Sequence, residues 1–138
     1  METNTYTPLA SFIDLLMDAV FAVNIDARIV FASAACERIF GYTAGEMVGA
    51  SIERLVAPDR PDEERRILEN AKRGETHIYE TIRIRKDSSP VDLSLAVSPI
   101  RDAHGSIVGV SSIARDITER KLAEEQILRL NEELELRV

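Results

Sequence analysis

The chain of 138 residues has one cysteine, no tryptophan, few aromatic residues and no surplus of positive charge. The single cysteine, Cys36, excludes an internal disulfide and any zinc or iron–sulfur site built from several cysteines. No apolar run approaches the roughly 18 residues that a membrane-spanning helix needs, and no signal-peptide pattern is visible. A formal net charge of −7 argues against a nucleic-acid partner, because binding requires cations near the phosphates. We therefore expect a cytoplasmic protein that does not insert into a membrane.

Hydrophobic residues make up 45% of the chain and charged residues 30%, as in ordinary globular proteins. The length suffices for one domain and an appendage. We divide it into residues 1–18, an N-terminal tail and flanking amphipathic helix, residues 19–117, the core, and residues 118–138, a C-terminal helix. The flanking helix is predicted from apolar residues at helical spacing that follow Pro8, namely Leu9, Phe12, Ile13, Leu16 and Met17.

The stretch at residues 107–119 organises the rest of the chain. It begins as a strand of valine, isoleucine and small residues that carries no charge before Arg115. Such a strand tolerates burial on both faces and is predicted at the centre of a covered sheet. The short apolar run at residues 19–25 is interpreted in the same way. A charged helix follows at once, without glycine or proline between, so a change in the core can reach a neighbouring domain.

The remaining elements alternate between short helices and strands. Ser33 is expected to cap a first short helix, Gly41 to end it, and Thr43 with Glu46 to form a capping box. A longer helix is predicted at residues 59–72. Strands of period two follow at residues 78–85 and 91–98. Segregated helices and strands indicate the α+β class, with helices on one face of an antiparallel sheet.

Several motifs together resemble those of a PAS domain over roughly residues 9–122. The most specific is RDITERK at residues 115–121, similar to the DIT signature at the end of such domains. FGYT and EMVG at residues 40–43 and 46–49 match a helical segment of the family. RKDSSPV at residues 85–91 resembles a family hairpin, although Ser88 replaces its glycine.

The resemblance implies a five-stranded antiparallel sheet in the order 2-1-5-4-3 and a role in sensing rather than catalysis. It further implies a cleft between the sheet and the central helices. Haem is argued against because residues 59–72 contain no histidine, and His77 and His104 fall at a strand edge and in a turn. A light-sensing flavin is argued against because Ile52 stands where the reactive cysteine would be, and Ala114 where the glutamine would face the flavin. We predict no cofactor.

Two hypotheses for the cleft remain open. It either holds a small apolar ligand or is filled by its own side chains, in which case the domain only dimerises and relays. The predicted cleft residues are all apolar and suit both, with the packed interior slightly favoured: Ile67, Leu68, Leu93, Leu95, Val97 and Val110.

The C-terminal helix is predicted to form a parallel homodimer. Its apolar residues step by four, three and four, which is a heptad seam: Ala123, Ile127, Leu130 and Leu134. The N-terminal stripe Leu9, Phe12, Ile13 and Leu16 is expected to add to the interface. Beyond residue 138 we expect an effector in the same chain, a histidine kinase first and a diguanylate cyclase or other effector as the alternative.

Signal relay is assigned to four residues at the end of the sheet. Asp116 is expected to cap the C-terminal helix by accepting from Thr118 or Glu119. In the family the matching aspartate pairs with a basic residue of the hairpin, here Arg85 or Lys86. The acidic and basic pairs at residues 63–66 are interpreted as a solvated helix face, because adjacent helical side chains do not face each other.

Overall fold

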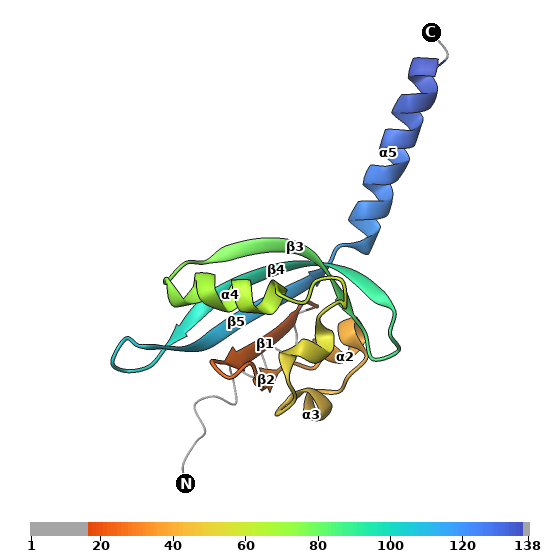
Figure 1. The fold of residues 1–138 in the computed structure, drawn as a ribbon. Coiled ribbons are helices and arrows are strands. Elements are labelled where there is room, and N and C mark those ends of the chain that lie inside the picture. The colour runs from red at the N-terminus through yellow and green to blue at the C-terminus, as the bar shows by residue number, and fades with distance from the viewer. Residues whose placement is uncertain (1–16, 137–138) are drawn as a thin grey trace.

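The computed structural model describes residues 17–136 as an antiparallel sheet with helices packed on one face (Figure 1). The sheet order β2-β1-β5-β4-β3 is the predicted one, and the α+β class is confirmed. The expected N-terminal helix lies outside the described residues, as do Leu9, Phe12, Ile13 and Leu16. The five strands are β1 (Ala19–Asn24), β2 (Ile29–Ala32), β3 (His77–Ile84), β4 (Pro90–Arg101) and β5 (Ile107–Asp116).

Four of the helical elements lie between β2 and β3, and the fifth, α5, follows β5 and projects away from the core (Figure 1). They are α2 (Ala35–Phe40), α3 (Ala44–Met47), the 3-10 helix η1 (Ile52–Leu55), α4 (Glu63–Lys72) and α5 (Thr118–Leu136).

Two of the three helix ends predicted for the short helices are confirmed. Thr43 and Glu46 form the predicted capping box, each side chain accepting from the other's amide at 3.1 Å. Gly41 ends α2 with a φ of 83°, as expected. The cap predicted at Ser33 is wrong: the N-cap is Ala34, and Ser33 Oγ instead accepts from the amide of Val20 at 2.9 Å. This bond ties the start of α2 to β1.

The predicted start of the long helix, at residue 59, is also wrong. α4 begins at Glu63, and residues 58–62 form turns in which the Arg60 amide donates to the Ala57 carbonyl at 2.9 Å. Pro61 explains the delay, because proline disfavours helical backbone at the residue before it. Pro61 also brings no amide hydrogen to a helical ladder.

The core lies between the inner face of the sheet and the helices. Phe21 of β1 meets Phe40 of α2 edge to face, with ring centroids 5.9 Å apart, and Cys36 is buried beside them. The outer face of the central strands is more open than predicted. Ile113 of β5 is 45% exposed, and the outer residues of β1 are only partly buried. β5 is therefore apolar because it lies at the centre of the sheet, and not because both of its faces are buried.

Candidate functional site

The junction between β5 and α5 is fastened by a carboxylate that caps the helix. Asp116 Oδ1 accepts from the Thr118 amide at 2.9 Å and from the Thr118 hydroxyl at 2.5 Å. Ile117, the single residue between strand and helix, is 5% exposed and donates its amide to the Asp92 carbonyl of β4 at 3.0 Å. The start of α5 is thus attached to the sheet through Thr118, which donates to Asp116 of β5, and through Ile117, which donates to β4.

Arg85 approaches the same carboxylate from the β3–β4 hairpin. Its Nη2 lies 3.9 Å from Asp116 Oδ2, at the long end of an ion pair. The guanidinium is held in place by stronger bonds, from Nε to the Ile39 carbonyl at 3.1 Å and from Nη1 to Ser89 Oγ at 3.2 Å. The structure therefore brings Arg85, Asp116 and Thr118 together, and Arg85 connects them to the end of α2.

Lys86, the other expected partner, lies elsewhere. Its Nζ is 2.6 Å from Glu46 Oε2, and its amide donates to the Phe40 carbonyl at 2.8 Å. The ammonium of Lys86 lowers the pKa of the Glu46 carboxyl. The pairing of Lys86 with Asp116 is not formed, because the hairpin turns the two basic side chains to different neighbours.

A second fastening of α5 was not anticipated from the sequence. Glu80, on β3, forms an ion pair with Arg120 and another with Lys121 at 3.2 Å. Both partners lie in the first turn of α5, and they lower the pKa of the Glu80 carboxyl. The sequence around Glu80 does not indicate these ion pairs, because Arg120 is forty residues away along the chain. These pairs orient α5 relative to the edge of the sheet.

The six predicted cleft residues lie in one interior cluster. Ile67, Leu93, Leu95, Val97 and Val110 are buried there, and Leu68 packs against them at partial exposure. Ile67 also lines a hollow of about 260 Å³ between α4 and β3, whose other walls are polar side chains such as Arg60, Asn70 and Tyr79.

The two positions that argue against a flavin lie in the interior of the domain. Ile52 of η1 and Ala114 of β5 are both fully buried. His77 pairs with Glu75 at 2.7 Å at the entry to β3, and His104 lies in the β4–β5 turn. Among residues 17–136, no three histidine, cysteine or acidic side chains gather as a metal site would require. In the same range no helix combines the length and apolarity of a membrane span.

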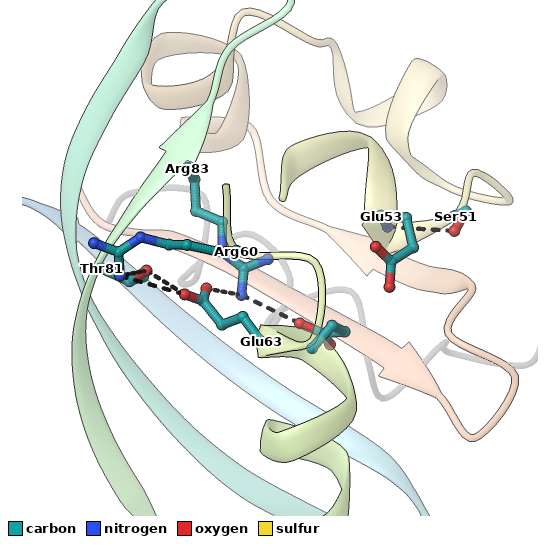
Figure 2. A network of polar contacts seen from close by, with 7 residues as sticks. Ser51, Glu53, Arg60, Glu63, Thr81 and Arg83 are labelled. Atoms are coloured by element: carbon teal, nitrogen blue, oxygen red, sulfur yellow. Dashed lines mark hydrogen bonds and ion pairs between the residues drawn. The ribbon is translucent and has the colours of Figure 1, made fainter. Parts of the chain in front are cut away.

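A buried polar cluster between α4 and β3 contradicts the expected solvated face. Arg83 points inward from β3, is 2% exposed and lies beside Glu63, which its Nη2 meets at 2.9 Å (Figure 2). The same nitrogen lies 3.2 Å from Glu64 Oε2. Only Arg65 and Arg66 of the four charged residues face solvent. The inward arginine of a half-buried strand is the signal that could have found the cluster, because it requires carboxylates opposite.

The predicted seam of α5 is exposed along its length. Ala123 lies on the surface, and Ile127, Leu130 and Leu134 are each 58–60% exposed. Among residues 17–136, the hydrogen bonds and ion pairs that join α5 to the sheet all come from its first turn. A row of apolar side chains on a projecting helix is typical of a surface that pairs with another helix.

The matching family model is that of the PAS domain, and it covers residues 17–119. The chain belongs to the PAS domain family. This PAS domain has the features that the resemblance predicted. They are the sheet order, the short helices over the inner face of the sheet and Asp-Ile-Thr at the strand-to-helix junction.

Two curated relatives are histidine kinases. The chain is 27% identical over 119 residues to the methanogenesis regulatory histidine kinase FilI of Methanothrix harundinacea, covering 86% of this chain and 13% of the relative. It is 28% identical over 120 residues to the signal transduction histidine-protein kinase AtoS of Escherichia coli, covering 87% of this chain and 19% of the relative. The PAS domain therefore spans less than a fifth of these relatives.

Solved structures show the same fold. A PAS domain of a protein from Colwellia psychrerythraea matches with a TM-score of 0.77 at 20% identity, over 84% of this chain and 99% of the other. An RNA-binding light-oxygen-voltage receptor matches with a TM-score of 0.77 at 23% identity, over 96% of this chain and 39% of the receptor chain. Light-oxygen-voltage domains are thus among the neighbours, and the fold by itself does not exclude a flavin.

Proposed function

We propose that this PAS domain is a signal-relay module that passes a conformational change through α5 to an effector in the same chain. The observation that carries the proposal is the direct continuation of a central strand into a projecting helix, with Ile117 as the only residue between them. Because Ile117 is anchored in the core and to β4, a shift of β5 against β4 changes the position and rotation of α5. Asp116, Thr118 and Arg85 act as the latch at this point.

The effector is a histidine kinase. The similarity to FilI and AtoS, both named histidine kinases, supports this choice over a diguanylate cyclase or another effector. Domain and effector would share the cytoplasm. The activity belongs to the effector, and the domain itself is a non-catalytic sensor.

The module is a homodimer paired in parallel through α5. The exposed seam Ala123, Ile127, Leu130 and Leu134 supports this arrangement, since it leaves three large apolar side chains in contact with water in a single chain. Pairing the seams brings two effectors side by side. A contribution of the N-terminal stripe Leu9, Phe12, Ile13 and Leu16 to this interface stays a prediction, because these residues lie outside residues 17–136.

The interior holds no haem and forms no flavin adduct. Ile52 supplies no thiol for an adduct, and α4 supplies no histidine for iron. The close contacts of Phe21 with Phe40, together with the buried cluster of aliphatic side chains, favour an interior filled by the domain's own residues. Any ligand would be small and apolar.

Insertions into α5 of the full-length protein test this function. Seven residues inserted after Glu125 keep the seam on nearly the same face, while two residues turn the distal helix by about 200°. We expect the seven-residue insertion to retain the autophosphorylation rate and the two-residue insertion to change it several-fold. Equal rates for the two insertions would show that α5 carries no rotational information.

A further inference from the structure

Two carboxylates share one guanidinium nitrogen at the start of α4. Glu63 Oε1 lies 2.9 Å and Glu64 Oε2 3.2 Å from Nη2 of Arg83. The side chains of Arg83 and Glu64 are 2% and 5% exposed, and that of Glu63 is 13% exposed. One buried positive charge thus faces two negative charges, and of the two carboxylates Glu64 is the more deeply buried.

The surrounding charges do not remove the imbalance. Arg60 lies 3.7 Å from Glu63 Oε2, but its side chain is 40% exposed and the interaction is shared with solvent. Glu53 of η1 adds repulsion at Glu64. Thr81 of β3 donates a neutral hydrogen bond to Glu63 Oε2 at 2.6 Å. A buried carboxylate in such a setting favours its neutral form.

The cluster also has an acceptor without a donor. Glu63 Oε1 is buried and makes no hydrogen bond, although it is close to Arg83, and Arg83 Nε makes none either. A protonated carboxyl is a hydrogen-bond donor, whereas a carboxylate only accepts. A proton on Glu64 would remove one negative charge and would make Glu64 a donor beside the guanidinium nitrogen that Glu63 Oε1 also faces.

We propose that Glu64 binds a proton beside Glu63 and Arg83, which makes this cluster a buried proton-binding site between α4 and β3. The direction of the pKa shift agrees: burial raises the pKa of Glu64 above its ordinary value of 4.5, while Arg83 opposes the rise. The folded state then holds the proton more tightly than the unfolded chain does. The resulting stabilisation is complete below pH 4.5 and is lost as the pH rises through the folded pKa.

Carboxyl-carbon NMR of the purified chain with labelled glutamate tests the site directly. Glu64→Gln identifies the signal of Glu64, and its titration midpoint in the wild type is expected above 4.5. Glu63→Gln should lower that midpoint, because it removes the neighbouring negative charge. Glu69→Gln, a change at an exposed residue of the same helix, should leave it unchanged. A Glu64 midpoint at or below 4.5, or one that Glu63→Gln does not lower, would overturn the proposal.

Urea unfolding at pH 5 and pH 8 gives a second, independent measurement. Wild type should lose more stability than Glu64→Gln between these pH values, because only wild type has the Glu64 carboxyl that gives up its proton. The same loss in both proteins would also overturn the proposal. Neither experiment involves the effector, so these results stand apart from the test of the relay.

Discussion

Thr118 donates both its amide and its hydroxyl to the same oxygen of Asp116, across the point where β5 becomes α5. The second oxygen of Asp116 faces Arg85 at 3.9 Å, with both side chains partly exposed. Such a cap is typically worth about 1 kcal/mol, and a partly exposed ion pair about 1 kcal/mol or less. These contacts contribute little to overall stability but fix the angle at which the helix leaves the sheet.

Thr118→Ala should weaken the junction less than a change of Asp116. It removes the hydroxyl donor, while the amide of residue 118 can still donate to Asp116. We expect a loss of at most about 1 kcal/mol in the free energy of unfolding, measured with urea. A loss of several kcal/mol would show that Thr118 has a structural role that these contacts do not explain.

Ser88→Gly should stabilise the domain. Ser88 has a φ of 70° in the β3–β4 hairpin, in the left-handed region that glycine adopts without strain. We expect a gain of up to about 1 kcal/mol in the free energy of unfolding. The reverse change in the next hairpin, Gly105→Ser, is the matched control and should cost a similar amount, because Gly105 has a φ of 81° with open space around it. A loss on Ser88→Gly would contradict the strain argument.

Gly109→Ala should disrupt the pairing of β1 with β5. A Cβ at this position would lie 2.3 Å from the Val23 carbonyl oxygen, which belongs to the adjacent strand. We expect a loss of about 1–3 kcal/mol on thermal or urea unfolding, as for other overpacked sites. Gly45→Ala is the control, since its nearest neighbour atom is 4.0 Å away. A variant at Gly109 as stable as wild type would contradict the contact between these strands.

Ile127→Asp should convert the predicted homodimer to a monomer. A charge in the middle of a paired apolar seam is left unpaired and desolvated, so the dimer should weaken at least tenfold, or about 1.4 kcal/mol. Leu128→Asp is the matched control, since Leu128 is equally exposed at 61% but lies off the seam. Light scattering at micromolar concentration distinguishes the two. A monomeric wild type would contradict the prediction of a homodimer.

The sequence predicts this fold well where one local pattern determines an element. The alternation in β4, the capping box at Thr43 and the change of period after Asp116 each depend on residues close in the chain. The resemblance then supplied the order of the strands, which periodicity alone does not contain.

The site was less predictable because its contacts are between distant segments. Glu64 is buried by Arg83, nineteen residues away, and α4 alone gives no reason to bury it. Lys86 meets Glu46 at a separation of forty residues and is thereby unavailable to Asp116. Charged residues on a helix surface are usually solvated, so the sequence of α4 does not indicate the exception, and the one signal is Arg83 in the half-buried strand β3.

The autophosphorylation rate of the full-length protein carrying Asp116→Ala, compared with the melting temperature of its PAS domain, tests the relay most directly. Removing the cap and the ion pair should cost about 1–2 kcal/mol and lower the melting temperature by about 4–16 °C, with the domain still folded. We expect that the rate of this variant no longer responds to the signal and stays at one fixed level. An unchanged, signal-dependent rate would contradict the relay, and so would a domain that simply unfolds.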